Sequence, residues 1–172
     1  MLQVLAWFGV AGWGYAQAQA GVPDAQLIRA AYLYNFAKFT TWPDVPRRDG
    51  RLSLCVAGTD ALTPALQALG GRLVRGRFIA VHPVRGADLP DTCQMLYVAA
   101  SDVGRATALL RQARGLPLLT LSAQQGFAEA GGMVELTEVG GRTRFIINLG
   151  AARAVGLEIS PSLLSLSEVV GH

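Results

Sequence analysis

Two cysteines are the side chains in this sequence most able to do covalent chemistry. Cys55 lies inside one apolar run and Cys93 lies directly before another. An even number of cysteines in an exported chain favours a disulfide, and neighbouring strands would bring the two Cα atoms within the bridging range of about 4.4–6.8 Å. Two buried, unpaired cysteines or a reactive thiol pair are the alternatives. C-x-x-C spacing is absent, and two cysteines are too few ligands for a structural zinc site.

The N-terminus indicates export. Residues 1–20 contain no Asp, Glu, Lys or Arg, are mostly apolar, and end in the run Ala-Gln-Ala-Gln-Ala. This pattern predicts a secretory signal peptide that is cleaved after Ala20 or Ala18, and therefore a periplasmic mature chain. The alternative is an uncleaved anchor, but a spanning helix needs roughly 20 apolar residues and this run is shorter. No later segment is apolar and long enough to insert stably into a membrane.

Histidines and carboxylates offer few candidates for acid–base catalysis. His82 lies in a strand-like run beside a proline, where a structural role is more common than a catalytic one, and His172 is the last residue. The sequence has no H-E-x-x-H metal motif, no G-x-S-x-G nucleophile elbow, and neither a Walker nor a G-x-G-x-x-G phosphate loop. We therefore predict no catalytic residues, no metal site and no cofactor.

Apolar runs and helical segments alternate along residues 21–172, which predicts a single α/β domain. Strands are expected at 52–57, 78–84, 95–99 and 117–121, and helices at 24–41, 63–70, 104–114, 151–155 and 160–170. Alternation of this kind favours a largely parallel sheet with helices on both faces. Gly140-Gly141, between the runs 133–139 and 142–148, predicts a C-terminal antiparallel hairpin.

Small polar residues follow three of these expected strands. Such sheets bind ligands outside the carboxyl ends of their strands. A small-ligand site at this edge is therefore an alternative to a protein-binding role. Its candidate residues are Gly58, Thr59, Asp60, Ser101, Asp102 and Ser122.

The charge balance argues against a nucleic-acid partner. The chain has 15 basic and 12 acidic residues, a net charge of +3, and every basic residue except Lys38 is an arginine. The arginines are scattered, and no run approaches the blocks of five or more like charges that make a binding tail. The densest cluster comprises Arg47, Arg48 and Arg51, and it is followed by a second one of Arg72, Arg75 and Arg77.

Several segments together resemble the YfiR/HmsC-like family of periplasmic proteins. Each piece is unspecific alone, but their order and spacing over residues 25–168 are specific. The pieces are Ala-Ala-Tyr-Leu-Tyr-Asn-Phe-Ala-Lys-Phe at 30–39, Thr-Trp-Pro at 41–43, Leu-Cys-Val-Ala-Gly at 54–58, Cys-Gln-Met-Leu-Tyr-Val-Ala at 93–99, Pro-Leu-Leu-Thr-Leu-Ser at 117–122, Phe-Ala at 127–128, Gly-Gly-Met-Val at 131–134, Phe-Ile-Ile-Asn-Leu at 145–149, Ala-Ala-Arg at 151–153, and Leu-Glu-Ile-Ser at 157–160.

The resemblance implies a Rossmann-like α/β fold that tends to dimerise. It implies a non-catalytic periplasmic repressor of a membrane-bound diguanylate cyclase, which restrains cyclic-di-GMP synthesis and biofilm formation. Cys55 and Cys93 match the family's disulfide pair, whereas a second pair carried by some relatives is absent. The partner-binding surface of the family lies toward the C-terminal part, where apolar character alone suggests Ile159, Leu163 and Leu164. Core packing is the alternative role of these three residues, and apolar character favours it over partner contact. A thiol oxidoreductase, with an accessible low-pKa cysteine, is the enzymatic alternative.

Overall fold

The computed structural model describes residues 24–43, 50–86 and 88–171. The predicted leader with its cleavage site at Ala20 lies outside these residues, as do Arg47, Arg48 and His172. The helices are α1 (Asp24–Phe39), α2 (Thr63–Gln67), α3 (Val103–Ala113), α4 (Leu149–Ala154) and α5 (Pro161–Leu164). The strands are β1 (Thr40–Thr41), β2 (Arg51–Ala57), β3 (Leu73–Val74), β4 (Arg77–Val84), β5 (Met95–Val98), β6 (Leu119–Ser122), β7 (Val134–Val139), β8 (Arg142–Asn148), β9 (Glu158–Ile159) and β10 (Glu168–Val170).

The main sheet has eight strands in the order β10-β8-β7-β6-β5-β2-β4-β3. Its neighbours pair in parallel, except β3 with β4 and β7 with β8, which are antiparallel. The α/β class and the C-terminal hairpin are thus confirmed. The sheet is mixed, however. The described residues between β4 and β5 and between β6 and β7 form no helix. The structure therefore does not show a Rossmann-like fold.

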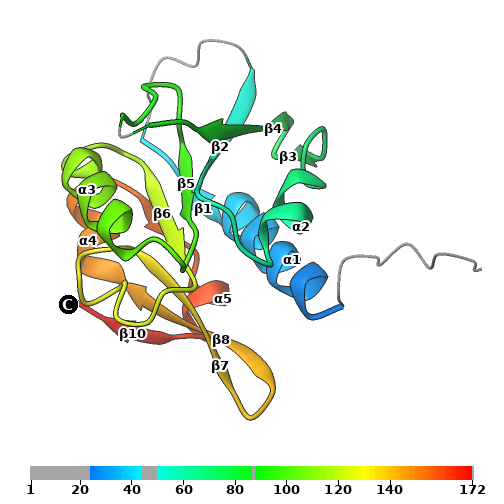
Figure 1. Cartoon of the computed structure of the whole chain (residues 1–172). Coiled ribbons are helices and arrows are strands. Elements are labelled where there is room, and N and C mark those ends of the chain that lie inside the picture. Colours follow the sequence, from blue (N-terminus) through cyan, green and yellow to red (C-terminus); the bar gives the residue numbers. More distant parts are fainter. Residues whose placement is uncertain (1–23, 44–49, 87, 172) are drawn as a thin grey trace, which may run out of the picture.

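Helices cover both faces of the sheet, as predicted (Figure 1). Side chains of β2 alternate between two cores because successive residues of a strand point to opposite faces. Leu54 and Val56 join the larger core with α1 and α2. Cys55 and Ala57 join the smaller core with α3.

The disulfide prediction is confirmed. Cys55 of β2 is bonded to Cys93, whose segment leads into β5, and their Cα atoms lie 5.7 Å apart. The bond is possible because β2 and β5 are adjacent parallel strands. Neither cysteine is a free thiol in this structure.

Helix α1 ends two residues earlier than the sequence predicts. Thr40 and Thr41 form β1 instead and pair with Ile159 and Glu158 of β9. Both residues are threonines, whose β-branched side chains favour strands over helices. The indole of Trp42 then donates to the Gln94 carbonyl at 3.2 Å, which fixes the exit of α1 against the sheet.

The prediction of a final helix reaching residue 170 is wrong. Helix α5 ends at Leu164, and residues 168–170 form β10, parallel to the end of β8. The outer edge of β8 there offers unpaired backbone groups, and the β-branched Val169 and Val170 suit a strand that pairs with it.

The β7–β8 hairpin extends beyond the rest of the sheet (Figure 1). Its turn is Gly140-Gly141, with φ of +57° and +71°, values that glycine adopts without steric cost. Pairing with β6 stops at Glu135, and pairing with β10 starts only at Ile146. Residues 136–145 therefore form a two-stranded projection, called the arm below, whose outer edges pair with no other described strand.

Candidate functional site

The carboxyl ends of β2 and β5 bring most of the predicted ligand-binding residues together. Gly58 lies so close to the next loop that a Cβ atom on it would stand 2.9 Å from the Cβ of Ala99. The Ser101 hydroxyl donates to the Thr59 carbonyl at 3.3 Å. Two loops that are separate in the sequence are thus in direct contact at this edge.

Asp60 is the centre of this edge. One carboxylate oxygen accepts from the amides of Leu62 and Thr63 at 3.0 and 3.2 Å, at the start of α2. The other accepts from the Tyr97 hydroxyl at 2.7 Å and the Ala100 amide at 3.3 Å. Burial, and then the hydrogen bond to Asp60, raise the pKa of Tyr97 well above its ordinary value. Tyr97 could not be recognised as a residue of this edge from the sequence, because a tyrosine in a strand resembles any other core residue.

The remaining two candidates also bond to the protein itself. Asp102 accepts from the Arg105 amide at 3.0 Å and caps α3. The Ser122 hydroxyl donates to the Val98 carbonyl at 2.8 Å and accepts from the Gln124 amide at 3.0 Å. A ligand at this edge would have to compete with these bonds, so ligand binding here stays a prediction.

Metal and histidine chemistry find little support in the part of the chain that the structure describes. Within it no three His, Cys, Asp or Glu side chains are placed to hold a metal ion. His82 lies in β4 with its side chain exposed.

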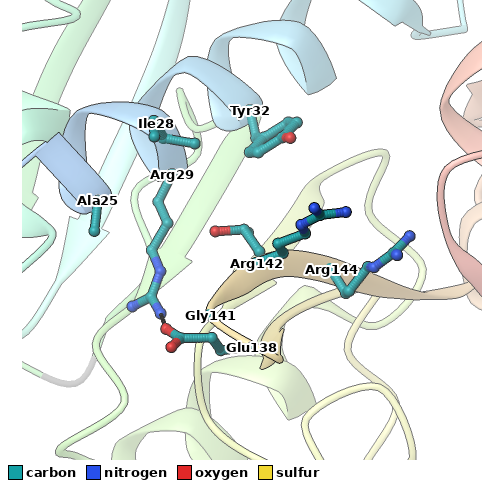
Figure 2. A pocket seen from close by; sticks show the side chains of 9 residues that line it. Ala25, Ile28, Arg29, Tyr32, Glu138, Gly141, Arg142 and Arg144 are labelled. Atoms are coloured by element: carbon teal, nitrogen blue, oxygen red, sulfur yellow. Dashed lines mark hydrogen bonds and ion pairs between the residues drawn. The ribbon is translucent and has the colours of Figure 1, made fainter.

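A groove of about 390 Å³ lies between α1 and the arm (Figure 2). The wall formed by α1 is mainly apolar, and the wall formed by the arm is mainly polar. Edge-to-face aromatic contacts join the two walls. The centroid of the Phe145 ring lies 4.7 Å from that of Tyr32 and 5.4 Å from that of Phe36. The lining residues are Ala25, Ile28, Arg29, Tyr32, Glu138, Gly141, Arg142, Thr143 and Arg144.

Three arginines and one glutamate set the charge of this groove. Arg29 donates to Glu138 at 2.6 Å, and their side chains are 21% and 55% exposed. Arg142 and Arg144 are both exposed, and no described residue pairs with either of them. Two of the arginines that line the groove thus carry guanidinium groups that no described carboxylate neutralises.

A second hollow of about 590 Å³ shares Arg29 and Glu138 with the groove. Three further carboxylates line it, those of Glu129, Glu135 and Glu168. Glu135 is buried and accepts from the amides of Gly126 and Ala128 at 3.2 and 3.1 Å. The Arg29–Glu138 pair therefore stands where a basic groove meets an acidic hollow.

A comparison of the chain with models of known protein families bears on the resemblance seen in its sequence. The family model described as YfiR/HmsC-like matches residues 26–168. This chain belongs to the YfiR/HmsC-like family. The match runs from α1 to the start of β10, and it includes the disulfide and every lining residue of the groove except Ala25. The YfiR/HmsC-like family is known for non-catalytic periplasmic regulators of diguanylate cyclases.

The partner-binding residues suggested by the sequence lie mostly inside the protein. Ile159 and Leu163 are only 6% and 4% exposed and belong to the larger core, with Leu164 partly buried beside them. Ile159 ends β9, and α5, which carries Leu163 and Leu164, packs against α1. Partner contact through these residues stays a prediction, since the structure leaves only Leu164 of the three partly accessible.

Among the described residues, no helix has the length and apolar character to cross a bilayer.

Sequence reasoning did not find the groove. The spacing of Arg142 and Arg144 on a strand was visible, but Arg29 and Glu138 are 109 residues apart. Only the packing of α1 across the hairpin brings them together.

Proposed function

We propose that this protein is a periplasmic regulator that binds the periplasmic part of an inner-membrane signalling protein, a diguanylate cyclase, and restrains cyclic-di-GMP synthesis. The family match over residues 26–168 carries this proposal. Dimer formation is compatible with it but is not required by it.

Two structural features support binding over catalysis. The polar residues at the carboxyl edge of the sheet hold α2, α3 and the strands together through their own hydrogen bonds. The Cys55–Cys93 disulfide closes off thiol chemistry while it is oxidised. Structural disulfides persist in oxidising compartments such as the periplasm.

The proposal includes the leader. Residues 1–20 act as a signal peptide that is removed after Ala20, so that residues 21–172 form the mature single-domain protein. Export places the mature chain on the side of the membrane where a sensor domain of a cyclase is accessible.

Affinity purification from the native bacterium tests partner binding. The chain carries a C-terminal tag, membranes are solubilised in mild detergent, and co-purified proteins are identified by mass spectrometry. The expected result is enrichment of a membrane protein with a diguanylate cyclase domain. The matched control is the same tagged chain without residues 1–20, which stays in the cytoplasm and should not recover that protein. Equal recovery by both chains, or enrichment of no cyclase, would contradict the proposal.

A further inference from the structure

We propose that the groove between α1 and the arm binds an extended acidic segment of the partner, whose carboxylates pair with Arg142 and Arg144. The proposal deepens the regulatory function above by naming the chemistry that the partner presents. Four properties of the groove lead to it.

The first property is charge. Three arginines and one glutamate line the groove, and that glutamate is already paired with Arg29. The planar guanidinium group matches a carboxylate in two parallel hydrogen bonds, which makes arginine well suited to recognising acidic side chains. The Arg29–Glu138 pair shows an arginine–carboxylate contact at the groove, through one hydrogen bond of 2.6 Å.

The second property is spacing. Arg142 and Arg144 are two positions apart on β8, so their side chains leave the same face of the strand about 6.8 Å apart along it. Acidic residues at alternate positions of an extended segment repeat at the same distance. Two carboxylates can therefore meet the two arginines without any change in the backbone of β8.

The third property is an open strand edge. From Arg142 to Phe145 the outer edge of β8 pairs with no described strand, because β10 begins its pairing at Ile146. An extended peptide can add to such an edge through main-chain hydrogen bonds, while its side chains give specificity. This edge favours an extended acidic segment over a helical one.

The fourth property is the wall formed by α1. Ala25, Ile28 and Tyr32 line it, and Ile28 is 53% exposed. In an extended segment that alternates acidic and apolar residues, the apolar side chains point away from the carboxylates. Such a segment can cover Ile28 while its acidic residues face the arginines.

Peptide binding to the purified mature protein tests the proposal. The probes are three fluorescein-labelled heptapeptides with valines at alternate positions, which differ only in carrying Glu, Gln or Lys between the valines. Fluorescence anisotropy in low salt measures their affinities. We expect the Glu peptide to bind about tenfold or more tightly than the Gln peptide, the Lys peptide to bind weakest, and added salt to reduce the difference because exposed ion pairs are screened.

Charge-reversal variants locate the site. Arg142→Glu together with Arg144→Glu should weaken binding of the Glu peptide about tenfold or more. The matched control is Arg111→Glu with Arg114→Glu, which makes the same change in net charge at two exposed arginines in and beside α3 that do not line the groove. This control should change affinity less than twofold. Circular dichroism confirms that both variants are folded.

Three results would overturn the proposal: equal affinity for the Glu and Gln peptides, equal weakening by both double variants, or no binding of the Glu peptide at millimolar concentration. None of these measurements involves a cyclase. A failure here therefore leaves the regulatory proposal standing, and a failure of the regulatory proposal leaves the peptide result unchanged.

Discussion

Tyr97 and Asp60 are joined by a hydrogen bond of 2.7 Å between the end of β5 and the loop that follows β2. Tyr97 is fully buried, and Asp60 also accepts from the amides of Leu62 and Thr63 at the start of α2. The pair thus couples a core strand to a helix at the edge where a ligand was predicted. These bonds give this edge a structural role, and substitution of either residue measures how much they contribute to the free energy of unfolding.

Removal of either partner should destabilise the fold. Asp60→Ala deletes the bonds to α2 and leaves the buried Tyr97 hydroxyl without an acceptor, at a cost of about 2–4 kcal/mol. Tyr97→Phe should cost about 1.5–3 kcal/mol. The double variant should cost at least about 0.5 kcal/mol less than the sum, since the two residues share one bond. Urea unfolding measures all three, and strict additivity would show that the bond contributes nothing.

The raised pKa of Tyr97 predicts a loss of stability in alkali. The folded chain holds the phenolic proton more tightly than the unfolded chain, in which a tyrosine titrates near pH 10. The contribution of Tyr97 should therefore be constant below about pH 10 and decrease above it, by at most about 1.4 kcal/mol per pH unit. Urea unfolding between pH 8 and 11 should show a shallower decrease in Tyr97→Phe than in the unmodified chain. Identical slopes would contradict this assignment.

The disulfide should contribute substantially to stability. The Cys55–Cys93 bond joins residues separated by 38 positions. The chain-entropy model gives about 4 kcal/mol for a loop of that size. A reducing agent should lower the urea midpoint of the unmodified chain and leave that of the Cys55→Ala, Cys93→Ala variant unchanged. An unmodified chain that is insensitive to reduction, after complete reduction is verified by mass, would refute the prediction.

Two glycines with similar backbones should respond differently to alanine. Gly58 and Gly76 have φ of +81° and +76°, but only at Gly58 would a Cβ atom meet another residue, at 2.9 Å. Both alanine variants should carry the strain of the left-handed backbone, about 1–2 kcal/mol. Gly58→Ala should cost at least about 1 kcal/mol more because of the contact with Ala99. Thermal unfolding compares them, and equal losses would mean that the two loops are not tightly packed.

Local patterns were enough to predict the centre of the sheet. The apolar runs of β2, β5 and β6 have few polar interruptions because both of their faces are buried. The two glycines of the β7–β8 turn were equally informative, since few other residues adopt positive φ at both positions. The Cys55–Cys93 bond followed once β2 and β5 were expected to be neighbours.

The short elements at the edges could not be predicted in the same way. β1 and β10 have two and three residues and exist because β9 and β8 offer backbone partners there. The topology rule did place Asp60 and Ser101 near each other. It could not show that both are engaged in hydrogen bonds within the protein. The groove depends on α1 crossing the arm, which no local pattern records.

The regulatory function is tested most directly by the cyclic-di-GMP content of the native bacterium. The nucleotide is measured by mass spectrometry in the wild type, in a strain lacking this gene, and in that strain complemented with either the full chain or residues 21–172 alone. The account predicts a raised level in the deletion strain that only the full chain, with its leader, restores. An unchanged level after deletion, or full restoration by residues 21–172 expressed without the leader, would contradict it.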